Sequence, residues 1–316
     1  MANSKNSGYG QALLMKIASY LPTFGRILIV KSSSDTADYN YQMLQDVITP
    51  DNDGRVRFFN TLQAAYDEAE TNNNDVILLD GHSVHILTAG LDVSKSRVHF
   101  IGMDSGDRLQ QQGARIRLTT AATSAYVMYN TGTRNTFRNI KFIQAATAAT
   151  GLNVVKESGE GTLYKNCSFV FEVADNLGGT TAQEMLFSGD SCTFKECTFG
   201  NDTLVTSAAR PVMLWKTDTA VVHEPKSNMF KECNFLMASS DAGATFVRLN
   251  AITDILYTNL FDRCTFQASV SVAAGTIALT GGAIQTGTGT TKGTINLCYP
   301  CVFNSGLALA SSGFNV

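Results

Sequence analysis

The chain has 316 residues, of which 44% are hydrophobic and 16% are charged. Its formal net charge of −3 excludes a strongly basic surface for nucleic acid or for an anionic membrane. No stretch approaches the roughly 18 consecutive apolar residues of a membrane-spanning helix, so we expect no membrane partner.

The first 24 residues are predicted to form a flexible arm and a short docking helix. Residues 1–10 are small and polar, whereas residues 11–20 have helical spacing that Pro22 and Gly25 bring to an end. The apolar run in this segment is too short for a signal peptide and is interrupted by Lys16. This helix either docks on a partner or packs on its own domain, and the sequence leaves both open. The docking candidates are Leu13, Leu14, Ile17 and Tyr20.

Residues 25–75 are predicted to form a small α/β cap region. Apolar runs predict strands at 26–30 and 56–59, and a helix is predicted at 39–48. The strongest helix signal covers residues 60–69, where Asn60 or Thr61 serves as the N-cap. We expect this helix to cover the open end of the β-structure that follows, where unpaired backbone groups and apolar side chains would otherwise meet water. Its apolar face consists of Leu62, Ala65, Tyr66 and Ala69.

A six-residue motif recurs through the second half of the chain. A clear copy reads FKECTF from Phe194 to Phe199, and related copies begin at residues 137, 164, 230, 261 and, more weakly, 298. The steps between first positions are 27, 30, 36, 31 and 37 residues. A repeat of this period indicates a solenoid.

The motif predicts an all-β chain, with a right-handed parallel β-helix over residues 76–316. Its fourth and sixth positions alternate as in a strand with one buried face, and two polar residues before them form a bend. Successive coils would stack these positions in two internal files. The predicted files are Ile140, Cys167, Cys197, Cys233 and Cys264, and Phe142, Phe169, Phe199, Phe235 and Phe266. Further strands are predicted at 76–79, 185–187, 212–215, 246–249 and 276–279, so each coil has at least two strand faces.

A helical repeat is the alternative at this period. Tetratricopeptide and ankyrin repeats need long segments of helical periodicity rich in Ala, Leu, Glu and Lys. From about residue 115 the chain is instead rich in Thr, Ser, Gly, Phe and Val in short runs between turn residues, which favours strands. The segment 282–293 is almost all Gly and Thr and is read as a loop or a loose last coil. We expect another subunit to close that end of the solenoid.

Seven cysteines are an odd number, and most occupy the same inward position of the repeat. Such a file indicates small apolar fillers in a reducing cytoplasm rather than disulfides. The pair Cys298 and Cys301 stands without a second pair at zinc spacing, so no metal is predicted there. We expect no cofactor.

A search for catalytic groups finds no convincing constellation. Glycoside hydrolysis needs two carboxylates facing one cleft. Glu196 and Glu232 share one position of the repeat, but each follows a lysine in the polar bend, which favours a solvated corner. Three residues of one loop, Asp218, His223 and Glu224, are interpreted as structural.

Asp80, His82 and His85 lie near the first coil and could bind a metal ion only if they faced the same side. His82 and His85 are three residues apart, so on one strand they would face opposite sides, and no metal site is predicted there. The sequence contains no nucleophile elbow, phosphate loop or dinucleotide fingerprint. Trp215 is the single Trp, so a sugar-stacking platform is not evident, although the 10 Tyr residues could serve as one. The sequence therefore predicts no enzymatic activity and no catalytic residues.

The order of parts in the N-terminal third resembles a group of tailed-phage virion proteins with a β-helix body. The resemblance covers about residues 25–105 and rests on the segments GRILIVKSS (25–33), GRVRFF (54–59), TLQAA (61–65) and NDVILLDGH (74–82). In that group a Pro-Gly-His turn usually follows the strand, whereas Asp80 stands in the Pro position here. The resemblance implies a structural virion component, often trimeric, built on the head or the tail. The expected free thiols fit assembly in the host cytoplasm.

Three hypotheses about function are kept, and the first two follow from the resemblance. The first is a non-enzymatic capsid decoration or head-spike protein, a homotrimer on the capsid surface that binds the major capsid protein through residues 1–50. The second is a tail spike or fibre that binds, and in one version cleaves, bacterial surface polysaccharide. The third is a cellular carbohydrate-active β-helix enzyme, which the expected lack of a secretion signal disfavours.

Overall fold

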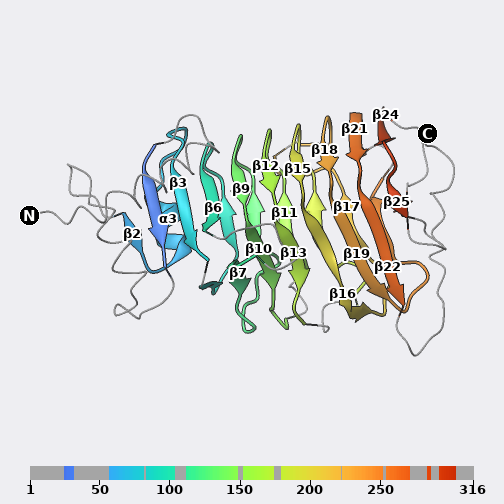
Figure 1. Ribbon diagram of the computed structural model, residues 1–316, viewed down its shortest axis with the longest axis horizontal. Coiled ribbons are helices and arrows are strands. Elements are labelled where there is room, and N and C mark those ends of the chain that lie inside the picture. The colour runs from blue at the N-terminus through green and yellow to red at the C-terminus, as the bar shows by residue number, and fades with distance from the viewer. Residues whose placement is uncertain are drawn as a thin grey trace, which may run out of the picture.

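A computed structural model describes residues 25–31, 57–81, 83–103, 112–148, 152–173, 179–221, 223–251, 254–270, 283–285 and 292–303. In these residues the chain is nearly all β. Its strands form three parallel sheets, each of which runs along the long axis of the molecule and gains one strand from each coil (Figure 1). The predicted right-handed parallel β-helix is therefore confirmed. The predicted docking helix with Leu13, Leu14, Ile17 and Tyr20, the helix at 39–48, His82 and the strand at 276–279 lie outside the described residues.

The three sheets are called A, B and C, and each successive coil visits them in that order. Sheet A contains, in spatial order, β2 (Phe58–Phe59), β1 (Ile27–Val30), β3 (Val76–Asp80), β6 (His99–Met103), β9 (Thr136–Arg138), β12 (Leu163–Lys165), β15 (Thr193–Lys195), β18 (Met229–Lys231), β21 (Leu256–Asp262) and β24 (Lys292–Cys298). Sheet B contains β4 (Val84–Leu87), β7 (Ala114–Leu118), β10 (Ile140–Gln144), β13 (Ser168–Phe171), β16 (Thr198–Thr206), β19 (Asn234–Ser239), β22 (Thr265–Val270) and β25 (Val302–Phe303). Sheet C contains β5 (Leu91–Val93), β8 (Met128–Asn130), β11 (Asn153–Glu157), β14 (Gln183–Phe187), β17 (Pro211–Trp215), β20 (Thr245–Leu249) and β23 (Ile284–Gln285).

The repeated motif forms the corner between sheets A and B. Its first residue points inward from a sheet A strand, and its third residue has a left-handed backbone, with φ between 50° and 57° in five successive copies. That conformation turns the chain so that the next strand starts in sheet B. The five corner residues are Asn139, Asn166, Glu196, Glu232 and Arg263.

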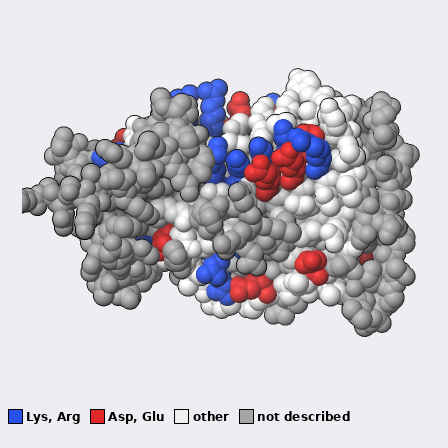
Figure 2. Space-filling view, in the orientation of Figure 1, with Lys and Arg blue, Asp and Glu red and all other residues white. Residues whose placement is uncertain are grey.

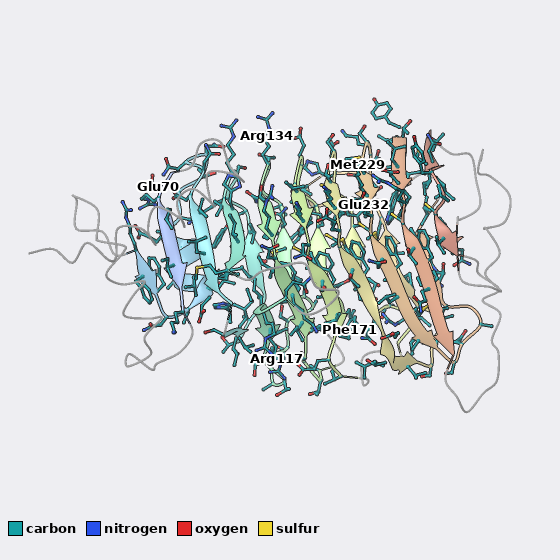
Figure 3. The ribbon with its side chains drawn as sticks, in the orientation of Figure 1. Glu70, Arg117, Arg134, Phe171, Met229 and Glu232 are labelled. Carbon is teal, nitrogen blue, oxygen red and sulfur yellow. The ribbon has the colours of Figure 1, made fainter. Side chains whose placement is uncertain are left out.

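Two files of stacked aromatic rings fill the interior along the axis (Figure 3). In the sheet B file the ring centroids of Phe142, Phe169, Phe199, Phe235 and Phe266 follow one another at 4.8–5.4 Å. The sheet A file was not foreseen in full, and its centroids are spaced 4.7–6.1 Å apart. It consists of Tyr66, Phe100, Phe137, Tyr164, Phe194, Phe230 and Phe261.

Buried thiols lie between these two files. Cys167, Cys197, Cys233 and Cys264 are free and buried, and they follow Ile140 at the corner of successive coils. Each Sγ lies within hydrogen-bond distance of a main-chain carbonyl, as Cys233 does with Phe194 O at 3.5 Å. Burial raises the pKa of the Cys197 and Cys233 thiols, so these groups stay protonated. They act as small apolar fillers.

The helix α3 (Leu62–Glu68) lies at the N-terminal end of the stack and contacts the first strands (Figure 1). Thr61, one of the two candidates from the sequence, is its N-cap, and Thr61 Oγ1 accepts a hydrogen bond from Ala64 N at 3.2 Å. The Tyr66 ring stacks on Phe100 at 6.1 Å and so begins the sheet A file. The helix therefore extends the apolar interior beyond the first coil.

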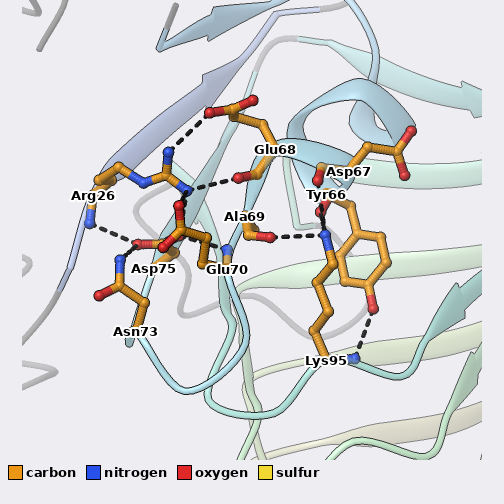
Figure 4. A network of polar contacts seen from close by, with 9 residues as sticks. All are labelled: Arg26, Tyr66, Asp67, Glu68, Ala69, Glu70, Asn73, Asp75 and Lys95. Atoms are coloured by element: carbon orange, nitrogen blue, oxygen red, sulfur yellow. Dashed lines mark hydrogen bonds and ion pairs between the residues drawn. The ribbon is translucent and has the colours of Figure 1, made fainter. Parts of the chain in front are cut away.

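Charged side chains fasten α3 to the first coil (Figure 4). The Arg26 guanidinium donates hydrogen bonds to Glu68 Oε1 at 2.8 Å and to Asp75 Oδ2 at 3.0 Å. Lys95 Nζ donates to the carbonyl oxygens of Tyr66, Asp67 and Ala69 at 2.7–2.8 Å. These carbonyls at the end of the helix have no partner within the helix, so the ammonium group satisfies them and complements the helix dipole.

Candidate functional site

The outer face of sheet C presents one side chain per coil in a continuous column. Strand pairing places each of these residues beside the next one on the adjacent strand, and we call each strand of a sheet one rung. Their neighbours along each strand point into the core. We call this column the sheet C face. It consists of Asp92, Tyr129, Lys156, Leu186, Leu214, Arg248 and Gln285.

Two tyrosines stand together at the N-terminal part of the sheet C face. The rings of Tyr126 and Tyr129 have centroids 5.6 Å apart and are tilted by 60°, and both side chains are half-buried. Tyr126 OH donates to Asp92 Oδ1 at 2.6 Å, and Tyr129 OH donates to Asp218 Oδ2 at 2.8 Å. Each ring is thus held by a different carboxylate, which fixes the orientation of the pair.

Asp218 belongs to a segment that reaches back along the axis from the coil of β17. Its main chain pairs with His223 in an antiparallel bridge, with N–O distances of 2.9 and 3.2 Å. Asp218 Oδ2 accepts from Ser158 Oγ at 2.6 Å and lies 3.1 Å from Lys156 Nζ, while Oδ1 accepts from Ala220 N at 3.0 Å. The side chain therefore binds groups of the β11 coil and of β8, which lie two and three strands before β17 in sheet C.

The surroundings of this cluster keep Asp218 ionised and Tyr129 neutral. Burial opposes the charge of Asp218, but hydrogen bonds from Ser158, Tyr129 and the Ala220 amide lower the pKa of its carboxyl to about 2. Burial, together with the bond to Asp218, raises the pKa of Tyr129 to about 12. Asp218 is therefore a weak base that orders its neighbours.

The groups that a ligand could reach are the tyrosine rings, Asp92 and the ammonium group of Lys156, which also pairs with Asp218. Asp92 is exposed, and its carboxylate accepts the hydrogen bond from Tyr126. Lys156 Nζ lies 3.9 Å from the Tyr129 ring centroid, so its charge sits over the aromatic face. Half-exposed rings beside a carboxylate and an ammonium group can pack against the C–H face of a sugar and hydrogen-bond its hydroxyls.

A buried carboxylate supports the site from inside the coil. Glu157 accepts hydrogen bonds from Asn130 Nδ2 at 2.9 and 3.0 Å, from Gly159 N at 2.6 Å and from Tyr164 OH. The next residue, Ser158, holds Asp218 through its hydroxyl and accepts a hydrogen bond from His223 Nδ1 through its carbonyl. Glu157 thus connects the core to the segment that carries the site.

Protonation of Glu157 is expected to make stability depend on pH near neutrality. Burial raises the pKa of Glu157 from 4.5 to about 7, so the folded state binds a proton that the unfolded state has released. The contribution of this group is fully present below pH 4.5 and is lost as pH rises to about 7, which lowers the free energy of unfolding by about 3 kcal/mol. Urea unfolding below, within and above this window measures the effect.

The matched variants are Glu157→Gln, which cannot titrate, and Glu160→Gln, which changes an exposed carboxyl in the same turn. As pH rises through the window the wild type should lose stability relative to Glu157→Gln, which has no proton to release at this position, whereas Glu160→Gln should follow the wild type. Parallel profiles for all three proteins would show that Glu157 keeps its ordinary pKa in the fold.

Several residues considered in the sequence take other places. Glu196 and Glu232 are half-exposed at the corner between sheets A and B, where they pair with Lys195 at 3.1 Å and Arg263 at 2.8 Å. His85 is buried with Nε2 3.2 Å from Asp80 O, and burial lowers its pKa. Sequence reasoning grouped Asp218 with His223 but missed Tyr129 and Lys156, which lie far away along the chain.

The described residues contain no group of three or more His, Cys, Asp or Glu side chains placed to hold a metal ion. Within the same part of the chain, no helix has the length and apolar character needed to cross a membrane.

Comparisons with known proteins define the fold class. No protein family and no curated protein matches the chain. Among solved structures, pectate lyase Pel9A matches with a TM-score of 0.55 and 13% identity, covering 87% of this chain and 62% of the lyase. The deglycosylated pectin methylesterase from Aspergillus niger matches with a TM-score of 0.46 and 10% identity, covering 90% of this chain and 91% of the esterase. A pectin methylesterase mutant in complex with a hexasaccharide matches with a TM-score of 0.46 and 11% identity, covering 78% of this chain and 81% of the esterase.

These matches correct one prediction from the sequence. The chain was predicted not to be an enzyme, and that prediction is contradicted because the protein of this fold that it matches at a TM-score of 0.55 is an enzyme, pectate lyase Pel9A. At 13% identity the likeness to the lyase shows the parallel β-helix fold and does not show an activity of this chain.

Proposed function

We propose that the protein binds an extended polysaccharide along the sheet C face. The observation that carries this proposal is the pair Tyr126 and Tyr129, held in place by Asp92 and Asp218 and flanked by the ammonium group of Lys156. Aromatic rings with a few fixed polar groups are typical of carbohydrate recognition. The matched enzymes support the substrate class, because their names refer to pectate and pectin.

The arrangement along the axis suits a long ligand rather than a single sugar. After Lys156 the column continues with Leu186 and Leu214, which are half-buried, and then with Arg248. Adjacent strands lie about 4.8 Å apart, so a chain of sugars parallel to the axis would meet aromatic, cationic, apolar and cationic side chains in turn. Each rung contributes one contact, and affinity would grow with ligand length.

The sequence resemblance of residues 25–105 supplies a biological setting for this proposal. A tail spike or fibre of a tailed phage would use such a face to bind bacterial surface polysaccharide. In this setting the protein forms a homotrimer and its N-terminal region attaches it to the virion. The setting rests on the sequence resemblance alone, whereas the binding face rests on the geometry of sheet C.

Replacing Tyr129 by alanine is expected to weaken polysaccharide binding at least tenfold, about 1.4 kcal/mol, because the ring and the anchor of Asp218 are both removed. Tyr129→Phe keeps the ring and should lose less. Tyr257→Ala, at a ring that is 66% exposed on β21 of sheet A, is the matched control. Titration of labelled bacterial surface and plant cell-wall polysaccharides measures affinity, and release of reducing ends in the same samples detects cleavage.

Equal affinity of wild type and Tyr129→Ala for a bound polysaccharide would overturn the assignment of the site. Failure of the wild type to bind any member of the panel would overturn the function itself. Circular dichroism of each variant verifies that the fold is retained.

A further inference from the structure

The sheet C face carries an arginine of fixed orientation near its C-terminal end. Arg248 lies on β20, and its side chain is half-buried. Nε donates a hydrogen bond to Gln285 Oε1 at 2.7 Å, and Nη2 donates to the carbonyl oxygens of Ala209 and Gly243 at 3.1 and 3.2 Å. These acceptors belong to the next strand and to the turns before β17 and β20, so they fix the plane of the guanidinium group.

The charge of Arg248 has no counter-charge in the described part of the chain. Its three acceptors are neutral, and burial lowers its pKa without a carboxylate that opposes the effect. By contrast, Arg117, Arg210 and Arg263 each form an ion pair with a glutamate. On the face seen in Figure 2, Lys and Arg side chains likewise gather beside Asp and Glu side chains. Arg248 is therefore a half-buried cation that a bound anion would stabilise.

Part of the guanidinium group remains free for a ligand. The hydrogen bonds described above use the Nε–H group and the two N–H groups of Nη2, whereas Nη1 has no acceptor among the described residues. Hydrogen bonds between a guanidinium group and an anionic oxygen are about twice as strong as those between neutral groups. The Nη1 edge of Arg248 is thus suited to a carboxylate.

The two rungs before Arg248 are apolar. Leu214 and Leu186 occupy the outward positions there, and both are half-buried. A carboxylate placed over them would lose hydration without gaining a hydrogen-bond partner. Neutral sugars suit these two rungs better than acidic ones.

The N-terminal part of the sheet C face carries negative charge. Asp92 is exposed there, and Asp218 lies 3.1 Å from Lys156 Nζ, so it offsets the charge of that ammonium group. Tyr129 lies four rungs from Arg248, which is about 19 Å along the axis. A polysaccharide that covers this distance meets carboxylates beside the tyrosines and a cation at its other end.

We propose that the polysaccharide bound on the sheet C face contains an acidic sugar among neutral ones, and that Arg248 binds the carboxylate of the acidic sugar. The neutral sugars lie over Leu214 and Leu186 and against the rings of Tyr126 and Tyr129. The opposite charges at the two ends give the bound chain one direction. This inference rests on the proposed function and names the class of its ligand.

The test uses the full chain with hyaluronate and xanthan, in which acidic sugars occur among neutral ones, and with the carboxyl-reduced form of each. The wild type is expected to bind at least one acidic form about tenfold more tightly than its reduced form, because reduction removes a charged hydrogen bond. Arg248→Gln should remove this preference and bind the reduced form like the wild type. The matched control Arg263→Gln removes a cation that pairs with Glu232 on sheet A, and it should keep the preference.

Two further measurements use the wild type alone. Its preference for the acidic form should fall as the NaCl concentration rises, because salt screens the charge of a half-exposed cation. Polygalacturonate has a carboxylate on every sugar and would place some of them beside Asp92, so it should bind more weakly than the preferred probe. A preference that does not respond to salt, or tighter binding of polygalacturonate, would contradict a single acidic position at Arg248.

Different results separate this inference from the proposed function. Wild-type binding without a preference for either acidic form would overturn the role of Arg248 and leave the proposed function standing. The same holds if Arg248→Gln keeps the preference or if Arg263→Gln loses it equally. Failure of the wild type to bind any polysaccharide, acidic or neutral, would overturn the proposed function instead.

Discussion

Replacing Phe230 by alanine is expected to lower the free energy of unfolding by about 3–5 kcal/mol. Its ring is fully buried, and its centroid lies 4.7 Å from those of Phe194 and Phe261 and 5.8 Å from that of Trp215. The neighbouring rings belong to strands fixed by the sheets, so they cannot move far enough to close the cavity. Urea unfolding followed by the fluorescence of Trp215, the single Trp, measures the change.

Tyr299→Ala is the control for this experiment. Its side chain is 78% exposed, so its removal should change the free energy of unfolding by less than about 0.5 kcal/mol. If Phe230→Ala were no more destabilising than Tyr299→Ala, the internal file of rings would not be the core of the fold.

Breaking the buried ion pair between Glu184 and Arg210 is expected to cost about 3–5 kcal/mol. The two guanidinium nitrogens donate to the two carboxylate oxygens at 3.0 and 2.8 Å, and the side chains are 1% and 5% exposed. The guanidinium also lies over the Phe171 ring at 5.4 Å. Arg210→Met would leave the Glu184 carboxylate buried without its partner, and denaturant unfolding reports the loss.

The pair variant Glu184→Met/Arg210→Met should recover most of that stability, because neither charge then remains buried alone. An exposed pair supplies the control. Arg117→Met, which leaves the half-exposed Glu172 without its partner, should cost less than about 1 kcal/mol. If the loss of unfolding free energy in the pair variant equalled the sum of the losses in Glu184→Met and Arg210→Met, the two charges would not depend on each other.

The repeat could be read from the sequence because its chemistry is local. Positions four and six of the motif alternate within one strand of sheet B, and the polar bend before them needs the left-handed residue that Asn166 and its equivalents provide. The strands of sheet A between β9 and β18 are much harder to read. Each of these strands has three residues, and only its middle side chain points inward, as Tyr164 does in β12. A single inward residue is too few to show the alternation by which a strand is recognised in a sequence.

The candidate site could not be read from the sequence because its parts come from different coils. Tyr129 and Asp218 are 89 residues apart, and Ser158 and Asp218 are 60 apart. Stacking of coils brings them together, and the lengths of the intervening loops decide which residues meet. The prediction that the chain is not an enzyme relied on the lack of a local motif. That inference was weak for this fold, because side chains gather across rungs instead of along one segment.

The measurement that tests the central claim most directly is a crystal structure of the protein with a bound oligosaccharide from the polysaccharide that it binds. We expect the sugar chain to lie parallel to the axis on the sheet C face, with one ring against Tyr126 or Tyr129 and the next residues over Lys156 and Leu186. An oligosaccharide bound on sheet B, or at an end of the stack with the sheet C face empty, would contradict the account.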